Sequence, residues 1–255
     1  MIFDTHAHYT DKRFEEDRDS LLLSMKDHGV GQIVEVGAGI SSTRDAVALA
    51  HRYDFVYASV GIHPEEIEQL TEQHMDWFKE LAADEKVIAV GEIGLDYYYD
   101  EPERSLQKQW FERQLELAKE VNLPVIIHSR DAAQDTLEIM KAHHAEEIGG
   151  VIHCFSYSTE MAETYLNMGF FLGIGGVVTF KNSRKLKEVV EMAPLDRLVL
   201  ETDAPYLTPV PYRGKRNASL YLPYVAQEIA RLKGVSEEEV VRVTEENARK
   251  LYRLE

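Results

Sequence analysis

The stretch VIAVG at residues 87–91, the segment ERSLQKQWFERQLELAKEV at 103–121 and the stretch PVII at 124–127 decide the fold. The first and third are short apolar runs rich in β-branched residues, which is typical of strands buried on both faces of a parallel sheet. The middle segment repeats apolar residues at helical spacing, at Leu106, Trp110, Leu117 and Val121. This helix has to end before the proline that opens the third stretch, because the residue preceding a proline disfavours the α conformation. The three stretches therefore predict one strand–helix–strand unit.

The same alternation fills the rest of the chain. The predicted strands are residues 1–5, 32–36, 56–60, 87–91, 124–127, 150–153, 170–174 and 197–202. The predicted helices are residues 14–28, 43–53, 71–83, 103–121, 132–143, 159–168, 185–192, 221–233 and 245–252, with a capping-box pattern at 236–239 that opens a late helix. Eight strands alternating with helices predict an α/β fold, a (β/α)8 TIM barrel formed as a single domain over residues 1–255. A doubly wound open sheet is the structural alternative, but no GxGxxG turn follows the first strand, so dinucleotide binding has little support.

The composition is that of an ordinary globular protein with an acidic balance. The 255 residues include 28 Lys and Arg against 45 Asp and Glu, a formal net charge of −17. This charge disfavours a protein that coats nucleic acid, although a metal and a few local cations can still hold a phosphodiester. We expect no membrane partner, because no apolar run approaches the roughly 18 residues of a membrane helix and the first residues do not resemble a signal peptide. The single cysteine, Cys154, favours a reducing cytoplasm.

Polar residues gather where the predicted strands end. In a TIM barrel these ends form the catalytic rim, and half of the ten histidines fall there. His6 and His8 are two apart on an extended strand, so their imidazoles point to the same side and can form half of a metal site. The other candidate ligands at this rim are His128, His153 and Asp203.

Glu92 stands at the end of the fourth predicted strand, and no lysine lies near it. Its carboxylate has two oxygens and can therefore bridge two cations. A buried glutamate paired to a neighbouring residue is the alternative interpretation. The candidate ligands are all nitrogen or oxygen donors, which suit Zn, Mn, Mg or Fe without selecting one.

Seven motifs in order along the chain resemble the TatD family of metal-dependent deoxyribonucleases, within the amidohydrolase-like barrels. They are DTHAH at 4–8, GIHP at 61–64, GEIGLDYY at 91–98, PVIIHSRDA at 124–132, HCFS at 153–156, LETDAPYL at 200–207 and RGKRN at 213–217. The resemblance runs from the first strand to the last helix. It implies a metal-dependent barrel hydrolase with its site at the rim of the strands.

The resemblance also implies two divalent cations. The first is expected at His6 and His8 with Asp203 close by or coordinating, and the second at His128 and His153, with Glu92 bridging the two. Asp203 and Glu92 are the catalytic candidates, since Asp203 would orient the attacking water and accept its proton. Asp4 and Glu201 lie one step deeper and are expected either to orient a ligand or to be hydrogen-bonded interior carboxylates.

Four further residues are candidates for holding a substrate. His63 is expected to contact a phosphate or to fix its own loop. Arg130, Arg213 and Arg216 are candidate phosphate ligands, because a guanidinium matches the geometry of phosphate. The tyrosines at 97–99 would either stack on an unpaired base or cover a loop.

Three functions remain open at this point. The leading hypothesis is a deoxyribonuclease that trims single-stranded DNA or DNA ends from the 3′ side, with no obligate protein partner. The second keeps the metals but changes the substrate to a small ester, amide or aminoacyl ester, because a fold does not determine the substrate. The third is a non-enzymatic barrel that binds a partner, which is disfavoured because that role needs no candidate base at Asp203.

Overall fold

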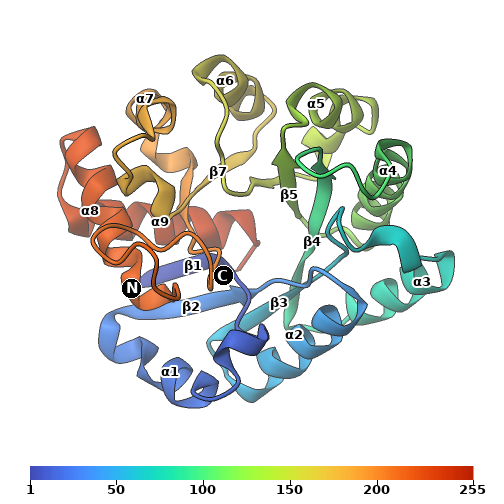
Figure 1. The fold of residues 1–255 in the computed structure, drawn as a ribbon, viewed down its shortest axis with the longest axis horizontal. Helices are drawn as coiled ribbons and strands as arrows, with labels where there is room; N and C mark the ends of the chain where they lie inside the picture. Colours follow the sequence, from blue (N-terminus) through green and yellow to red (C-terminus); the bar gives the residue numbers. More distant parts are fainter. Residues whose placement is uncertain (255) are drawn as a thin grey trace.

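Eight parallel strands form one sheet whose order follows the chain from β1 to β8 (Figure 1). The computed structural model describes residues 1–254, so residue 255 of the predicted domain lies outside the described residues. The strands are β1 (Ile2–Ala7), β2 (Val30–Glu35), β3 (Val56–Val60), β4 (Val87–Asp96), β5 (Val125–Arg130), β6 (Gly150–Ile152), β7 (Phe171–Ile174) and β8 (Leu198–Leu200).

The sheet is closed just beyond β8. Ala204 forms a parallel bridge with Ala7 at the end of β1. The backbone N–H of Asp203 donates to the carbonyl of His6 at 2.9 Å, and that of His8 donates to the carbonyl of Ala204 at 2.8 Å. The predicted TIM barrel is therefore confirmed, with the first and last strands joined next to three candidate ligands.

Nine α-helices accompany the strands in the described residues. They are α1 (Arg18–Ser24), α2 (Ile40–Arg52), α3 (Glu72–Leu81), α4 (Arg104–Val121), α5 (Ala133–Ala142), α6 (Thr159–Asn167), α7 (Arg184–Met192), α8 (Leu222–Lys233) and α9 (Glu237–Leu251). Short 3-10 helices lie at Lys12–Phe14, Met25–His28, Ile67–Gln69, Ala145–Glu147, Gly176–Thr179, Leu195–Arg197 and Ser219–Tyr221. Among residues 1–254, no helix is both long enough and apolar enough to cross a membrane.

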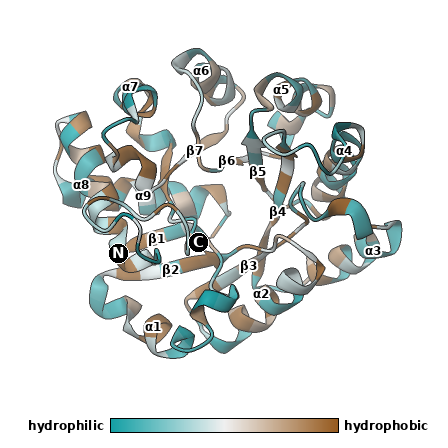
Figure 2. Cartoon of the chain, viewed as in Figure 1, coloured by the Kyte–Doolittle hydropathy of each residue, from teal (hydrophilic) through white to brown (hydrophobic). Residues whose placement is uncertain are grey.

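The helices surround the sheet and turn their apolar sides toward it (Figure 2). In α7, Leu186, Val189 and Val190 are buried, whereas Arg184 and Glu188 pair with each other on the outer side. This is the spacing that an amphipathic helix needs in order to cover a sheet. At the other end of the barrel, Ala248 and Leu251 of α9 and the following Tyr252 belong to a buried cluster that also contains residues of β1, β2 and β4–β8. Because α9 fills that end, the opposite rim of the strands is left as the place for a site.

Strand β4 is longer than predicted and continues to Asp96. Its last residues pair with β5, with Gly94 opposite His128 and Asp96 opposite Arg130. Gly94 has φ +146°, and a Cβ built there would lie 1.9 Å from the His128 carbonyl oxygen. The two strands can therefore run together under the rim only because this residue has no side chain.

Two predicted helices differ from the structure. The region 14–28 contains α1 and a separate 3-10 turn, because Asp17 has a non-helical φ of −134° and starts α1 late. Near the C-terminus, the Ser236 hydroxyl accepts a hydrogen bond from the N–H of Glu239, as the capping-box pattern predicts. The helix that begins there continues through 245–252 as the single helix α9, up to Leu251.

Candidate metal centre

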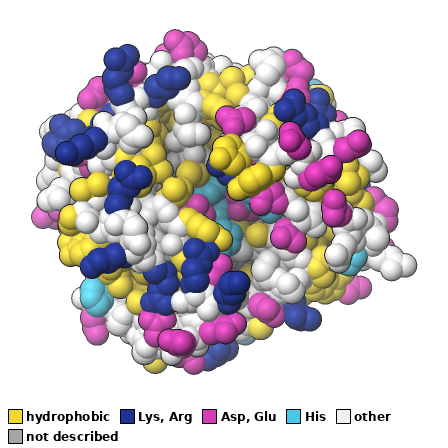
Figure 3. All heavy atoms as spheres, in the orientation of Figure 1, with side chains coloured by type: hydrophobic (Ala, Val, Ile, Leu, Met, Phe, Trp, Pro, Cys, Tyr) yellow, Lys and Arg dark blue, Asp and Glu magenta, His cyan; other side chains and the backbone are white. Residues whose placement is uncertain are grey.

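A cavity of about 790 Å³ opens at the C-terminal rim of the barrel (Figure 3). It is lined by five of the six predicted metal ligands, namely His8, Glu92, His128, His153 and Asp203. His6 is buried directly behind them, with its Nε2 3.1 Å from the Nε2 of His8. The strand ends of β1, β4 and β5 and the segments after β6 and β8 thus bring all six residues together, as expected for a barrel enzyme.

The Glu92 carboxylate lies at the centre of this group, and its side chain is only 5% exposed. Its Oε2 lies 3.3 Å from the Nε2 of His6 and 3.9 Å from that of His8. Its Oε1 lies 2.7 Å from the Nδ1 of His128 and 3.7 Å from the Nε2 of His153. The two oxygens of one carboxylate therefore face two different pairs of imidazoles, as a bridging ligand would.

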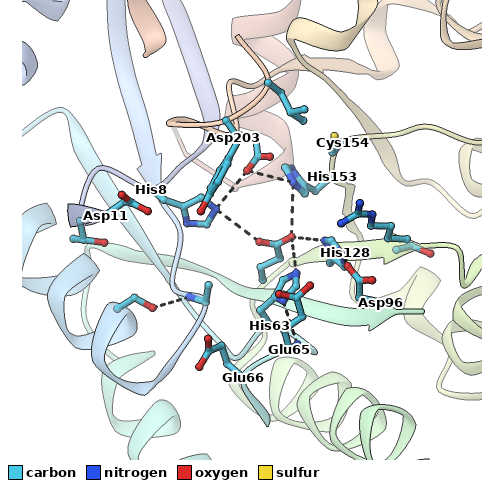
Figure 4. A pocket seen from close by; sticks show the side chains of 18 of the residues that line it. His8, Asp11, His63, Glu65, Glu66, Asp96, His128, His153, Cys154 and Asp203 are labelled. Atoms are coloured by element: carbon cyan, nitrogen blue, oxygen red, sulfur yellow. Dashed lines mark hydrogen bonds and ion pairs between the residues drawn. The ribbon is translucent and has the colours of Figure 1, made fainter. Parts of the chain in front are cut away.

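Asp203 completes one side of the group. Its Oδ1 lies 3.5 Å from the Nε2 of His8 and 3.9 Å from the Nε2 atoms of His6 and His153. The ligand atoms of His6, His8 and Asp203 all lie within 4.8 Å of one another. Figure 4 shows the side chains of His8, His153 and Asp203 converging on the middle of the cavity.

The far ring nitrogens of two imidazoles are held by partners outside the cavity. The Nδ1 of His8 lies 3.0 Å from the carbonyl of Val36, and the Nδ1 of His153 lies 3.0 Å from Glu201 Oε2. Both partners accept hydrogen bonds, so the proton is on Nδ1 in the neutral rings and the Nε2 lone pairs face the cavity. This tautomer is the one that can bind a cation through Nε2.

His63 has the opposite arrangement. Its Nδ1 accepts a hydrogen bond from the backbone N–H of Glu65 at 3.2 Å, and its Nε2 lies 3.9 Å from Glu92 Oε1. In the neutral ring the proton is then on Nε2, which points into the cavity as a donor. Although the ligand atoms of His63, Glu92 and His128 lie close enough to hold an ion, this tautomer fits His63 better to an acceptor such as a phosphate oxygen.

Asp96 is a further residue of the site that lies outside the predicted ligand set. Its Oδ2 lies 2.9 Å from the Nε2 of His128, and its Oδ1 accepts from the N–H of Tyr98. Glu92 and Asp96 are four residues apart on β4, so they share one face of the strand. This even spacing in the sequence would have indicated that Asp96 faces the site together with Glu92, but only if the strand was known to continue past residue 91.

Neighbouring carboxylates favour the charged form of three imidazoles of this cluster, whereas burial and the nearby His153 lower the pKa of His6. Burial alone disfavours charged imidazoles, but neighbouring carboxylates outweigh it and raise the pKa of His8, His128 and His153 to about 9. The main partners are Asp203 for His8, Asp96 for His128 and Glu201 for His153. His63 differs, because burial and the nearby His128 lower its pKa to about 3. The buried carboxylates therefore favour positive charge at this end of the barrel.

These observations fit a divalent cation. The donors are imidazole nitrogens and carboxylate oxygens, and the Nε2 atoms of His6 and His8 face each other at 3.1 Å. The Nδ1 of His6 is buried without a hydrogen-bond partner. A cation would supply the positive charge that the carboxylates require and would bind the converging lone pairs, and the nitrogen and oxygen donors suit Zn, Mn, Mg or Fe.

The two interior carboxylates take different positions. Glu201 contacts the ring of His153 and also accepts from the N–H of Cys154 at 2.6 Å. Asp4 does not reach any ligand ring. It accepts from the backbone N–H of His6 at 3.2 Å and from the hydroxyls of Thr202 and Ser219 at 2.7 and 2.6 Å. Asp4 therefore fixes the backbone of β1 against the segment after β8.

The structure brings only one of the three predicted phosphate-binding arginines to the cavity. Arg130 lines it. Arg216 instead pairs with Asp17 at 2.8 Å, and the exposed Arg213 lies over the ring of Phe180 at 4.1 Å. Neither Arg213 nor Arg216 is among the lining residues. The two arginines of the RGKR sequence therefore contact other side chains of the protein outside the cavity.

A (β/α)8 barrel with imidazoles and carboxylates clustered at its C-terminal rim defines the class of metal-dependent hydrolases. In agreement, the uncharacterized metal-dependent hydrolase YabD of Bacillus subtilis is 47% identical over 254 residues, with all of both chains covered. The family profile of TatD related DNases matches residues 3–253, and the chain belongs to this family.

Two further relatives agree with this membership. The 3′-5′ ssDNA/RNA exonuclease TatD of Erwinia billingiae is 35% identical, with 99% of each chain covered. The crystal structure of YJJV, a TatD homolog from Escherichia coli K12, matches with a TM-score of 0.93 at 31% identity, covering 100% of this chain and 98% of that one. The resemblance inferred from the seven motifs is therefore confirmed.

Removing metal is expected to lower thermal stability. A ligand held only by the folded state at about 100 times its Kd adds about 2.7 kcal/mol, which corresponds to about 5 °C or more in Tm for a chain of this size. Calorimetry before and after dialysis against EDTA measures the shift, and added Mn²⁺ should reverse it. An unchanged Tm, with no metal detected in the purified protein by mass spectrometry, would contradict the metal centre.

Proposed function

We propose that this protein is a two-metal 3′-5′ exonuclease that hydrolyses phosphodiester bonds of single-stranded DNA or DNA ends. The observation that carries the proposal is the position of Glu92, with one carboxylate oxygen facing His6 and His8 and the other facing His128 and His153. Two cations about one carboxylate suit an in-line displacement at phosphorus. The name of the Erwinia billingiae relative supports the polarity and the substrate. We place the enzyme in the cytoplasm, on the argument from its single cysteine.

The residues of the cavity have separable roles in this proposal. Bound divalent cations would supply Lewis acidity toward a phosphate ester and a water molecule. Asp203, whose side chain is 19% exposed, orients the attacking water and accepts its proton. His63 donates from Nε2 to a phosphate oxygen, and Arg130 provides the guanidinium that pairs with phosphate. Glu201 and Asp96 hold the rings of His153 and His128.

The test is a cleavage assay on single strands labelled at the 3′ or the 5′ end. Metal-stripped protein is resupplied with Mg²⁺ or Mn²⁺, and Asp203→Asn is assayed beside it. We expect immediate loss of the 3′ label, stepwise shortening of the 5′-labelled strand, dependence on metal, and a fall of at least about 10²-fold in the variant, because it loses the proton acceptor. Metal-loaded protein that leaves both strands intact would contradict the proposal.

One observation favours a second candidate, the hydrolysis of a small ester or amide. Besides the site carboxylates, the cavity is lined by four further acidic side chains at Asp11, Asp45, Glu65 and Glu66, against the single guanidinium of Arg130. Such a lining repels a substrate that carries many phosphates. Turnover of a small aryl ester or an aminoacyl ester by the metal-loaded protein, without cleavage of either DNA strand, would select this candidate.

A further inference from the structure

Exposed apolar side chains gather on two loops at the mouth of the cavity. Seven large apolar side chains are clearly exposed among the described residues, and five of these lie on the segments after β4 and β8. They are Tyr98, Tyr99, Tyr206, Leu207 and Val210. Figure 3 shows hydrophobic side chains bordering the hollow in which histidine and acidic atoms are visible. Single exposed apolar residues need no explanation, but a group beside a catalytic cavity indicates a binding surface.

The tyrosines on both loops are paired with arginines. The guanidinium of Arg130 lies over the ring of Tyr98 at 3.7 Å and 5.8 Å from the ring of Tyr99. The guanidinium of Arg13 lies over the ring of Tyr206 at 4.1 Å. Tyr98, Tyr99 and Tyr206 nevertheless remain 57%, 51% and 47% exposed. Each pair thus offers a flat aromatic ring with a guanidinium stacked against it, and such a surface can stack on a nucleobase.

Both loops are also tied to residues of the metal centre. The N–H of Tyr98 donates to the carboxylate of Asp96 at 2.9 Å, and the N–H of Tyr206 donates to the carbonyl of Asp203 at 2.7 Å. Tyr99, Tyr206 and Arg130 line the same cavity as Glu92. The backbone that carries the rings is therefore anchored to residues of the candidate metal centre.

The charge of the cavity makes stacking the better source of affinity for a strand. Its walls carry more carboxylates than cations. Contacts between the walls and the phosphate backbone, other than those at bound metals, therefore add little binding free energy. Stacking on an aromatic ring does not depend on the backbone charge and accepts every base. It does require bases that are free of a complementary strand.

We propose that the mouth carries two nucleobase platforms, one formed by Tyr98, Tyr99 and Arg130 and the other by Tyr206 and Arg13. They hold the unpaired bases of the nucleotides on the two sides of the scissile phosphate. This inference rests on the proposed nuclease function and names its substrate class, a strand with unstacked bases at the cleavage point. Paired duplex ends are poor substrates because their bases cannot reach the platforms.

The experiment compares Tyr99→Ala and Tyr206→Ala with Leu23→Ala, which removes an exposed apolar side chain on α1. Substrates are a single-stranded oligonucleotide and the same strand with an abasic analogue on either side of the terminal linkage. Binding is measured by fluorescence anisotropy with a cleavage-resistant phosphorothioate strand, and KM and kcat are measured with the natural one. The protein is metal-loaded throughout.

We expect each platform variant to weaken strand binding and to raise KM by about 5- to 150-fold, with a smaller change in kcat. Wild-type protein should lose a similar factor on each of the two abasic strands. On the strand that lacks the base held by its own platform, each variant should lose little more. Tyr206→Phe keeps the ring and should restore most of the binding lost in Tyr206→Ala. Leu23→Ala should behave as the wild type.

Equal binding and cleavage of natural and abasic strands, with the tyrosine variants indistinguishable from Leu23→Ala, would overturn the platforms and leave the nuclease function standing. Strand binding that depends on the tyrosines in a protein that cleaves no strand would support the platforms and count against the nuclease function. A metal-loaded protein that neither binds nor cleaves any strand would overturn both.

Discussion

Replacing Glu92 by glutamine is expected to lower metal-dependent turnover by at least about 10³-fold. Glutamine keeps the shape of the side chain but loses its negative charge, and it presents one oxygen and one NH2 group in place of two oxygens. The two carboxylate oxygens now face different imidazoles, so one side of the cluster necessarily loses its oxygen ligand. We therefore expect the metal content of each chain to fall by at least one ion, measured by mass spectrometry alongside kcat.

Glu120→Gln is the matched control for that substitution. Glu120 is an exposed carboxylate paired with Lys79 at 3.0 Å on the outer surface, and an exposed pair contributes little to stability. This variant should retain the metal content and the turnover of the wild type. If Glu92→Gln also retained both, the assignment of Glu92 as a bridging ligand would be wrong.

Gly94→Ala is expected to lower the free energy of unfolding by more than about 3 kcal/mol. A methyl group there would lie 1.9 Å from the carbonyl oxygen of His128 and 2.9 Å from its carbonyl carbon, and the φ of +146° disfavours any side chain. Strands β4 and β5 would have to separate directly beneath His128 to accommodate it. We therefore expect weaker metal binding together with the lost stability, measured by urea unfolding and by titration with Mn²⁺.

Gly169→Ala separates backbone strain from steric overlap in this comparison. Gly169 also has a positive φ, of +85°, but no atom lies within 4 Å of a Cβ built there. Its cost should be about 1–2 kcal/mol, the usual penalty of a left-handed conformation for an L-residue. Equal losses in the two variants would show that overlap with His128 does not matter.

The barrel could be predicted from the sequence because each strand is a continuous apolar run and each helix is amphipathic. In the predicted helix at 103–121, Trp110 and Leu117 are indeed buried. Strand ends were harder to predict. The pairing of residues 94–96 with β5 depends on tertiary contacts and on a glycine that tolerates close approach, so the apolar run alone predicts a strand that ends at residue 91.

The six candidate ligands could be predicted because the position of a strand end in a barrel determines where its next residues point. The surface arginines could not be predicted in this way. Arg216 lies on the long segment between β8 and α8, and its direction is set by Asp17, 199 residues earlier in the chain. A guanidinium that can pair with phosphate pairs equally well with a carboxylate, and composition alone does not distinguish the two.

The closure of the barrel determines the order in which the candidate ligands can come together during synthesis. His6 and His8 lie near the start of the chain, and the segment that contains Asp203 is hydrogen-bonded to them through its backbone. During synthesis, the side of the cluster formed by Glu92, His128 and His153 can assemble before the last strand has been translated. The side formed by His6, His8 and Asp203 can assemble only after residue 204 has left the ribosome, because this end of β1 pairs with Ala204. A nascent chain in which Asp203 has not yet emerged therefore lacks one of the six candidate ligands and the backbone contact that joins the two ends of the barrel.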